Sequence, residues 1–477
     1  MEQILQLIKH YIPIKLFKAL QPVYHFLLSA MATTLYNFPS NKLIVIGITG
    51  TTGKTTSLYL IVKMLIDAGY KVGYTSTAMF SDGKTEWLNN KKMTMPGRFF
   101  TQKMLAQMVK NKCHYAIIET TSEGINQFRH SFINYDILIF TNLYQEHIES
   151  HGSFENYKQA KGKLFAHLKQ CKTKYVDDKK YVVKADNGFK KIGANRVKKI
   201  IIVNADDKYA DYFLNFWAEE KVGYIKKIKN QKPKTKNNLN TIIEYGDIDV
   251  GNGFTKFKMN EIDIILKLLG AFNAVNAMNA VCVGLSQKIS LEKIKTGLEK
   301  IKNIPGRLEL IKEGQPFTVI VDYAFEPEAV KKLYETVKVF SHQRIIHLLG
   351  STGGGRDVMR RSELGKIAGA KADLVIITNE DPYDEDPQLI IDQVSSGAID
   401  EGKILNKNLF KILDRREAIE KSLVLAEEND LVLITGKGCE QAMCLANGVK
   451  ISWDDREIVK EKLGRITRDT VEKEIIA

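Results

Sequence analysis

The sequence predicts an α/β protein with two doubly wound domains behind a short helical segment. The first observation is that apolar, β-branched runs at 72–75, 115–118 and 137–140 alternate with helical patterns. The second is a similar alternation, with runs at 318–321, 345–349, 374–377 and 431–434, after the breakpoint Ile304-Pro305-Gly306. The third is a strand, a glycine-rich turn and a helix between Lys42 and Asp67. Alternating strands and helices favour mostly parallel sheets.

The stretch GITGTTGKTT at 47–56 has the context of a phosphate-binding loop. We expect the glycines at 47, 50 and 53 to let the backbone turn tightly and point its N–H groups inward. The helix beginning near Lys54 adds its positive dipole end. Lys54 can reach the β- and γ-phosphates of ATP, and the Thr55 hydroxyl can bind Mg²⁺. The expected ATP-binding residues of the loop are Gly50, Thr51, Thr52, Gly53, Lys54, Thr55 and Thr56.

The strand before this loop and the breakpoint at 304–306 divide the chain into three predicted parts. Residues 1–41 form a short helical N-terminal segment, residues 42–303 form a central P-loop-type ATPase domain with a mostly parallel sheet, and residues 304–477 form a C-terminal Rossmann-like α/β domain. The helix at 268–285 lies near the end of the central domain, and 226–238 is expected to be a mobile loop.

Net charge, cysteine spacing and hydropathy limit the classes of partner and compartment that we expect. The 477 residues carry a net charge of +14, which can indicate anionic small substrates, nucleic acid or a lysine-rich solvated surface. Because the lysines are spread along the chain, we favour small anionic substrates and expect no nucleic-acid partner. The five cysteines form no CxxC pair, which argues against a disulfide framework or a zinc site. No signal peptide or membrane span is visible, so a cytoplasmic protein is expected.

The N-terminal segment has two interpretations. Residues 14–36 are expected to be helical, with Pro22 at a break or a new start. In the simpler interpretation this helix packs on the next domain. In the other, its lysines and apolar side chains form a basic amphipathic surface that contacts a membrane or a lipid-linked substrate.

Charged side chains follow the predicted strands, where ligands sit in parallel α/β sheets. Glu119 ends one strand and could bind Mg²⁺ beside the phosphate loop, although a solvated acid is the simpler alternative. Another strand is followed by two histidines and several acids, and then by a helix that carries Lys158, Lys161 and Lys163. Alone, this segment could be a surface loop and a basic helix.

Together these motifs resemble the Mur ligases, which join a carboxylate to an amine at the expense of ATP. The likeness covers roughly residues 42–463. The loop reads G-x-x-G-T-x-G-K-T, and the strand-T-N-x-x-x-D-H pattern is met by TNLYQEH, with Glu146 in place of the aspartate. The resemblance implies that His147 binds a second Mg²⁺. It also implies that Lys161 carries a carbamate that helps to hold the metal. The implied catalytic residues are Lys54, Glu119, His147 and Lys161, and the implied metal ligands are Thr55, Glu119, His147 and Lys161.

Further motifs resemble the tripeptide-forming branch of that family. MTMPG and ETTSEGINQFR place Thr94, Ser122 and Arg129 at donor-substrate positions, while Glu123 stands where a histidine is usual. The nucleotide motifs GAFNAVN, IPGRLELI and VDYAFEPEA place Asn273, Arg307, Asp322 and Phe325 around ATP. Phe325 also replaces a histidine. Taken singly, the two asparagines of the GAFNAVN helix could be cap or buried amide residues.

The acceptor amino acid is expected at the C-terminal domain. GSTGGGRDVMRR supplies Arg356 and Arg360 as carboxylate-binding candidates, because arginine recognises carboxylates in a bidentate way. TNEDPYDEDP and TGKGCEQ match acceptor motifs. They supply Glu380, Asp381, Tyr383, Gly436 and Glu440, and Cys439 replaces a histidine. Tyr383 stands where an arginine grips the distal carboxylate of diaminopimelate. With the acids at 384–386, this favours a basic acceptor such as lysine.

The resemblance implies an ATP-dependent acid–amino-acid ligase that adds an amino acid to a UDP-N-acetylmuramoyl-dipeptide through an acyl phosphate, with two Mg²⁺ ions. Two alternatives stay open. One is a related ligase acting on a lipid-linked muropeptide, a folate or a polyamide. The other is a non-catalytic nucleotide-binding protein.

The short segment before the ATPase domain raises a question about the donor. Family members begin with a whole α/β domain that binds uridine diphosphate, and about 40 residues are too few for such a core. Either the central domain binds the nucleotide loosely around Thr94 and Arg129, which we favour, or the donor is lipid-linked and residues 14–36 lie near a membrane.

Overall fold

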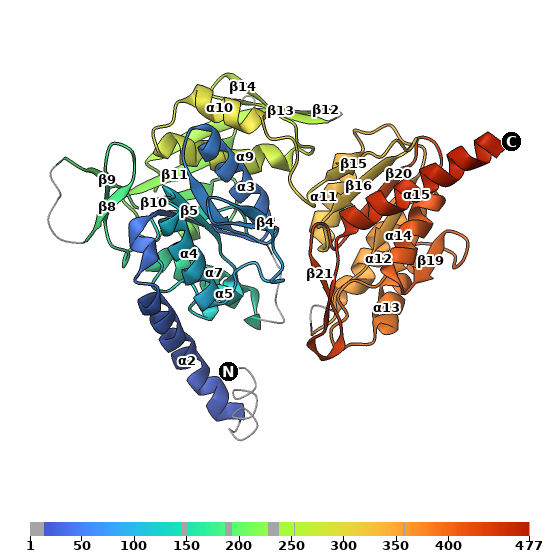
Figure 1. Ribbon diagram of the computed structural model, residues 1–477, viewed down its shortest axis with the longest axis horizontal. Helices are drawn as coiled ribbons and strands as arrows, with labels where there is room; N and C mark the ends of the chain where they lie inside the picture. The colour runs from blue at the N-terminus through green and yellow to red at the C-terminus, as the bar shows by residue number, and fades with distance from the viewer. Residues whose placement is uncertain are drawn as a thin grey trace.

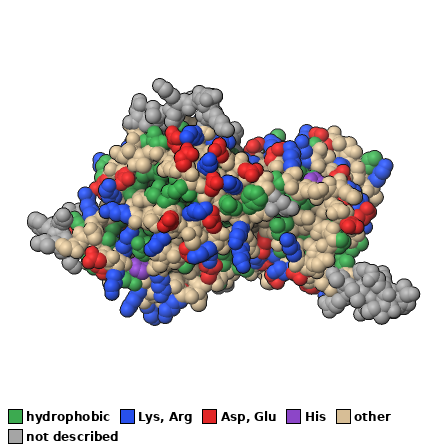
Figure 2. All heavy atoms as spheres, turned by 90° about the horizontal axis from the view of Figure 1, so that it is seen from above, with side chains coloured by type: hydrophobic (Ala, Val, Ile, Leu, Met, Phe, Trp, Pro, Cys, Tyr) green, Lys and Arg blue, Asp and Glu red, His purple; other side chains and the backbone are tan. Residues whose placement is uncertain are grey.

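The computed structural model describes residues 14–144, 151–186, 193–227, 238–251, 253–355 and 358–476, with the side chains of 14–19 and 467–476 left out. Two lobes lie side by side, and a helix extends outward from the first (Figure 1). The first lobe is built on an 11-stranded sheet and the second on a six-stranded sheet. Seen from above, basic side chains are spread over both lobes and interleaved with acidic ones (Figure 2).

The large sheet has a parallel centre and antiparallel edges. Its order is β14-β13-β12-β11-β10-β6-β1-β5-β2-β3-β4, and the strands from β12 to β2 are parallel. The strands are β1 (Ile44–Thr49), β2 (Val72–Thr75), β3 (Met79–Ser81), β4 (Glu86–Leu88), β5 (Tyr115–Glu119), β6 (Ile137–Phe140), β10 (Ile200–Asn204), β11 (Glu220–Lys226), β12 (Thr241–Gly251), β13 (Phe254–Met259) and β14 (Ile262–Leu266). A small sheet joins β7 (Lys174–Val176), β8 (Val182–Ala185) and β9 (Asn195–Val197).

Helices cover both faces of this sheet, which explains why its central strands are apolar throughout. Ile44, Ile46 and Ile48 of β1 face one core and Val45 faces the other, because successive side chains point to opposite faces. The first core is covered by α3 (Lys54–Asp67), α9 (Phe272–Ser286) and α10 (Leu291–Glu299). The second is covered by α4 (Arg98–Lys110), α5 (Ser122–Asn126), α7 (Phe154–Leu168) and α8 (Ala210–Leu214).

The second lobe is a smaller α/β sandwich. Its sheet has the order β15-β16-β20-β17-β18-β19, and all pairs except β15-β16 are parallel. The strands are β15 (Glu309–Ile311), β16 (Thr318–Asp322), β17 (Ile345–Leu349), β18 (Leu374–Thr378), β19 (Leu409–Ile412) and β20 (Leu431–Thr435), with β21 (Ala442–Cys444) and β22 (Lys450–Ser452) as a hairpin. α11 (Pro327–Val337), α12 (Met359–Lys371) and α13 (Pro387–Asp400) cover one face, and α14 (Arg415–Val424) and α15 (Asp455–Ile476) the other. Two 3₁₀ turns, η1 (Pro39–Lys42) and η2 (Ala446–Gly448), complete the described elements.

The predicted α/β architecture is confirmed, with three local corrections. Helix α2 (Ile14–Leu35) continues through Pro22, where a break was expected. Helix α9 begins at Phe272, after a turn at Gly270 with φ of 100°, so 268–271 is not helical. Gly47 lies inside β1, where a Cβ would come within 2.8 Å of Leu138 and Tyr135, so this glycine serves packing and not the turn. The mobile loop expected at 226–238 lies mostly outside the described residues.

Helix α2 packs on the first lobe with its small residues. Ser29, Ala32 and Thr33 are buried, and the Ser29 hydroxyl donates to the Phe128 carbonyl oxygen at 2.9 Å. Its large apolar side chains point outward instead: Leu20, Val23, Leu27, Met31 and Leu35 are all exposed. Among the described residues, no helix is long and apolar enough to cross a membrane.

Candidate active site

The phosphate loop lies between β1 and α3, and its two positive-φ glycines set its shape. Gly50 and Gly53 have φ of 152° and 76°, which residues with a Cβ rarely adopt. A Cβ at Gly50 would lie 2.0 Å from the Thr141 hydroxyl oxygen, and one at Gly53 2.4 Å from Asn276 Oδ1. The Thr52 amide donates to Asn142 Oδ1 at 2.9 Å. The loop is therefore held by the neighbouring strand β6 and by helix α9.

Two lysines converge on the carbonyl groups of this loop. Lys54 Nζ donates to the Gly50 and Thr51 carbonyl oxygens at 3.1 and 2.6 Å. Lys161 Nζ, from the buried face of α7, donates to the same Gly50 oxygen at 2.9 Å and lies 4.4 Å from the centre of the Tyr157 ring. Two ammonium groups and the positive end of α3 at one turn make a site suited to a polyphosphate.

A chain of oxygen atoms leads away from the loop. The Thr55 hydroxyl donates to the Glu119 carboxylate at 3.0 Å, and Glu119 accepts from the Thr77 amide and hydroxyl at 2.8 Å each. The Thr77 hydroxyl oxygen lies 2.9 Å from the Thr94 hydroxyl oxygen, and because its own proton is donated to Glu119, it accepts from Thr94. Hydroxyl and carboxylate oxygens beside phosphate are the ligands that Mg²⁺ prefers, so Thr55 and Glu119 fit the expected metal. His147 lies outside the described residues.

The expected nucleotide residues come from both lobes. Asn273 Nδ2 donates to the Leu269 carbonyl oxygen at 2.7 Å, and Asn276 Nδ2 donates to Asn273 Oδ1 at 3.1 Å. Asn273 therefore holds the turn before α9, and Asn276 holds the side chain of Asn273. Arg307 stacks on the Tyr323 ring, with its guanidinium carbon 4.3 Å from the ring centre. Arg360 lies over the face of Phe325 at 5.5 Å.

Asp322 ends β16 beside the turn after the first lobe. It accepts hydrogen bonds from the Leu308 and Ala324 amides, both at 2.7 Å. Burial raises the pKa of its carboxyl group, while Arg307 and the amides act in the opposite direction. A carboxylate at this position can accept hydrogen bonds from ribose hydroxyls.

The three residues predicted to bind the donor all lie in the first lobe and line one cavity. Ser122 Oγ lies 3.0 Å from His151 Nε2. Arg129 contacts the Met95 carbonyl oxygen and donates to Gln127 Oε1 at 2.6 Å, so it braces the turn that carries Thr94. Burial and the neighbouring Arg98 lower the pKa of Arg129 to about 10.

The acceptor residues of the second lobe form a charged group. Asp381 is joined to Lys437 at 2.8 Å and to Lys92 at 2.7 Å, and its oxygen accepts from the Cys444 amide at 2.7 Å. Although burial opposes it, these two ammonium groups hold the pKa of Asp381 below its ordinary value. Glu440 also contacts both lysines and accepts from the Tyr323 hydroxyl at 3.1 Å.

Glu380 is the buried carboxyl group of this site. Burial is the main cause that raises its pKa to about 7, with Asp381 adding to the effect and Arg415 opposing it. Within the described part of the chain, its Oε2 atom has no hydrogen-bond partner. Gly436, with φ of 106°, passes so close that a Cβ there would lie 2.3 Å from this oxygen. Tyr383 has φ of 52° and lines the same cavity.

Several charged residues predicted at the acceptor have partners within the second lobe. Arg360 pairs with Glu326 and donates to the Thr352 hydroxyl at 2.5 Å, and Arg356 lies outside the described residues. Of the three acids after Tyr383, Glu385 pairs with Arg361, whereas Asp384 accepts from a backbone amide. Asp386 caps α13. These contacts are local, and the predicted attraction of the three acids for a cationic acceptor stays a prediction.

Lys92, Lys437 and His151 are the residues that the sequence prediction missed. Lys437 is the lysine of the TGKGCEQ motif and could have been found there. No sequence signal marks Lys92, since its partners are 289 and 348 residues further along the chain.

One cavity of about 1470 Å³ joins these groups. It is lined by the phosphate loop and Glu119, by the donor residues, and by residues of the second lobe. The predicted residues among its lining are Thr51, Thr52, Gly53, Lys54, Thr55, Thr56, Thr94, Glu119, Ser122, Arg129, Asn273, Arg307, Asp322, Phe325, Arg360, Glu380, Asp381, Tyr383, Gly436 and Glu440.

The fold and this cavity define a nucleotide-binding enzyme in which two α/β domains enclose one site. Comparison with known families gives the particular class. The Mur ligase middle domain model matches residues 48–198 and 187–284, and the model of the Mur ligase glutamate ligase domain matches residues 306–438. The chain belongs to the Mur ligase family, and it is an ATP-dependent ligase. Members of this family generally use ATP and Mg²⁺.

Individual relatives agree with this assignment. A UDP-N-acetylmuramyl-tripeptide synthetase of Borreliella burgdorferi is 34% identical over 94% of this chain and 81% of its own length. A UDP-N-acetylmuramoyl-L-alanyl-D-glutamate–2,6-diaminopimelate ligase of Clostridium acetobutylicum is 30% identical over 91% and 81%. A solved diaminopimelate ligase of that type matches 89% of this chain and 79% of its own, with 25% identity and a TM-score of 0.54. A folylpolyglutamate synthase of Mycobacterium tuberculosis shares the fold, with a TM-score of 0.62 at 14% identity.

Proposed function

We propose that this ligase adds an amino acid to a UDP-N-acetylmuramoyl-dipeptide in peptidoglycan precursor synthesis. The observation that carries the proposal is the shared cavity, which brings the phosphate loop, the donor turn and the acceptor carboxylates to one space. The relatives named as tripeptide synthetases support the same step. Such a reaction needs all three substrates side by side with water excluded, because an activated carboxylate would otherwise hydrolyse.

The charged groups at the phosphate loop have different proposed roles. Lys54, which lines the cavity, and Lys161, which is buried behind the loop, would neutralise the phosphate groups of ATP. Thr55 and Glu119 would hold Mg²⁺, which screens the charge that develops during phosphoryl transfer. The carbamate on Lys161 remains part of the proposal. The buried position of its Nζ, beside the loop and away from solvent, favours a permanent role next to the phosphate groups. A carbamate there would convert the cation into a metal-binding anion.

The acceptor is proposed to be a basic amino acid. Glu380, Asp381 and Glu440 place three carboxylates on the cavity wall, and one oxygen of Glu380 is not hydrogen-bonded within the described chain. An ammonium group can satisfy that oxygen. Tyr383 replaces the arginine that would pair with a second carboxylate on the acceptor. The support therefore comes mainly from the Glu380 oxygen, which has no partner among the described residues. Asp381 and Glu440 already pair with the lysines at 92 and 437, and the acids at 384–386 have local partners.

The donor is proposed to be UDP-linked and bound by the central domain around Thr94 and Arg129. The alternative, a lipid-linked donor, rests on the exposed apolar side chains of α2. That helix is joined to the segment that carries Arg129 through Arg98 of α4. Arg98 donates to the Gln127 carbonyl oxygen at 3.0 Å and to Ser29 Oγ, on α2, at 3.2 Å.

The proposal is tested by phosphate release with Mg²⁺-ATP, a panel of donors and a panel of amino acids. We expect saturable turnover with a UDP-N-acetylmuramoyl-dipeptide and lysine. In competition, lysine should be incorporated ahead of diaminopimelate. Turnover restricted to a lipid-linked donor in detergent, or to folate, would refute the donor assignment. Selective use of diaminopimelate would refute the acceptor assignment.

A further inference from the structure

Lys92 lies on a turn that the first lobe holds rigidly. Asn89 Nδ2 donates to the Ser76 and Met93 carbonyl oxygens at 2.8 and 3.0 Å, and its Oδ1 accepts from the Lys91 amide at 2.8 Å. Lys92 itself has φ of 55°, a left-handed conformation that is uncommon for a residue with a Cβ. The turn therefore fixes the direction in which the Lys92 side chain leaves the lobe.

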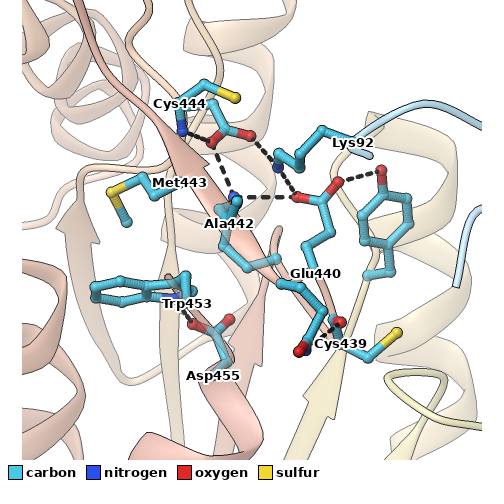
Figure 3. Close-up of polar contacts among 12 residues, drawn as sticks. Lys92, Cys439, Glu440, Ala442, Met443, Cys444, Trp453 and Asp455 are labelled. Carbon is cyan, nitrogen blue, oxygen red and sulfur yellow. Dashed lines mark hydrogen bonds and ion pairs between the residues drawn. The ribbon is translucent and has the colours of Figure 1, made fainter. Parts of the chain in front are cut away.

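The Lys92 ammonium group crosses from the first lobe to the second. It donates to Asp381 Oδ2 at 2.7 Å and forms an ion pair with Glu440, and its side chain is 5% exposed. Figure 3 shows Lys92 reaching from its loop toward Glu440. The other carboxylate oxygen of Glu440 accepts a hydrogen bond from the Tyr323 hydroxyl at 3.1 Å. Lys437 contacts the same two carboxylates from within the second lobe, at 2.8 and 3.1 Å. Two cations thus balance two carboxylates, and one of those cations belongs to the other domain.

The same turn also leads to the metal-binding side of the cavity. Two residues after Lys92, the Thr94 hydroxyl donates to the Thr77 hydroxyl oxygen at 2.9 Å, and the Thr77 hydroxyl donates to Glu119 at 2.8 Å. The turn at 89–95 therefore contacts the proposed acceptor carboxylates at one end and is linked through Thr77 to the carboxylate expected to bind Mg²⁺ at the other. Its position couples the placement of the second lobe to the site of phosphoryl transfer.

We propose that Lys92 is a positioning residue that holds Asp381 and Glu440 over the donor turn and so keeps the two domains closed around the substrates. This inference rests on the proposed function for the identity of the amino acid that binds there. Buried ion pairs contribute orientation more reliably than net stability, and removing one partner leaves an uncompensated charge. Each domain has its own hydrophobic core, and the core of the first domain takes Cys439 and that of the second takes Leu269 from the other domain. The effect should therefore fall mainly on the arrangement of the domains and not on their folding.

The test compares Lys92→Met with Lys92→Arg and with Lys91→Met. Lys91 is the adjacent, exposed lysine, whose described contact is the Phe100 ring at 5.7 Å, so it is a matched control for loss of one charge. We expect Lys92→Met to lower kcat/KM for the acceptor about 10- to 100-fold. Lys92→Arg should recover most of the activity, and Lys91→Met should match the wild type. Small-angle X-ray scattering of the ligand-free proteins should show a larger radius of gyration for Lys92→Met alone, with melting temperatures unchanged.

Two results would overturn the proposal. A lower acceptor KM in Lys92→Met would show that Lys92 competes with the acceptor for the carboxylates. An unchanged radius of gyration together with unchanged kinetics would show that the contact has no positioning role. If the wild type turns over none of the donor and acceptor pairs, the proposed function fails, and the scattering comparison still decides whether Lys92 holds the domains together.

Discussion

The phosphate loop and the acceptor site are built in opposite ways. The loop at 50–56 is one continuous segment, and its shape follows from two glycines and the helix that starts at Lys54. The acceptor site joins Glu380 and Asp381 to Glu440, and it is completed by Lys92 from the other domain. The first site depends on local backbone geometry and the second on the relative position of two domains. We therefore expect substitutions in the loop to affect chemistry directly, and those in the acceptor site to act through binding and closure.

The largest expected effect is that of Lys54→Ala on ATP turnover. Lys54 is the loop lysine whose ammonium group lies at the Gly50 and Thr51 carbonyl oxygens, where it can follow the transferring phosphoryl group. Its loss should lower kcat at least ~10³-fold, because it removes charge stabilisation in the transition state. Phosphate release under saturating substrates measures this. Lys63→Ala, on the same helix and paired with Glu86 at the surface, should retain full activity; comparable activity of the two variants would contradict the role of Lys54.

Lys161→Ala is expected to have the next largest effect, about 10²-fold on kcat. Its side chain reaches the loop from α7, and a carbamate on it would help to hold the metal. If the native group is a carbamate, short carboxylates such as acetate or propionate should partly restore the rate, and bicarbonate should raise the activity of the wild type. Lys163→Ala is the control, since Lys163 lies on the same helix and its Nζ donates to Asn126 instead. Full activity of Lys161→Ala without additives would exclude both roles.

The sequence predicts features built from one continuous segment better than features built from separate segments. The strand–loop–helix unit and the place of Glu119 at the end of β5 were predicted, because strand ends can be read from periodicity. Lys161 was singled out among the lysines of α7 by the resemblance to the Mur ligases. The pairing of Glu385 with Arg361 and the contact of Lys92 with Glu440 could not be predicted, since each depends on how separate segments pack. Gly47 shows the limit within one motif: its role in packing against Leu138 is decided by a neighbouring strand.

A test confined to the acceptor site is Gly436→Ala. Gly436 has φ of 106°, and the added Cβ would lie 2.3 Å from Glu380 Oε2, so the carboxylate would have to move. We expect KM for the acceptor to rise roughly 10-fold, with KM for ATP unchanged, because the disturbance stays in the second lobe. Gly402→Ala is the control for backbone strain alone. Gly402 also has a positive φ, but an added Cβ there would meet no other atom. Equal kinetic effects from the two variants would show that strain, and not displacement of Glu380, is the cause.

The smallest expected effect is on stability, and it concerns the protonation of Glu380. Burial raises the pKa of this carboxyl group from 4.5 to about 7 in the folded protein. Between these values the unfolded chain has already lost the proton that the folded chain keeps, so the contribution of Glu380 to stability falls as pH rises through this window. Glu380→Gln, which stays neutral, should therefore be as stable as the wild type near pH 4.5 and more stable at pH 8.

The expected gain at pH 8 is on the order of 3 kcal/mol, or several degrees in the melting temperature of the second lobe. Differential scanning calorimetry at both pH values measures it, and Glu401→Gln, a substitution at a surface position after α13, controls for the loss of a surface charge. A Glu380→Gln variant that is less stable than the wild type at pH 8 would show that the ionised carboxylate is stabilised by Arg415 and Lys437 more than burial destabilises it. The acceptor cavity would then hold a permanent anion at Glu380, and the attraction of a cationic acceptor would not depend on pH in this range.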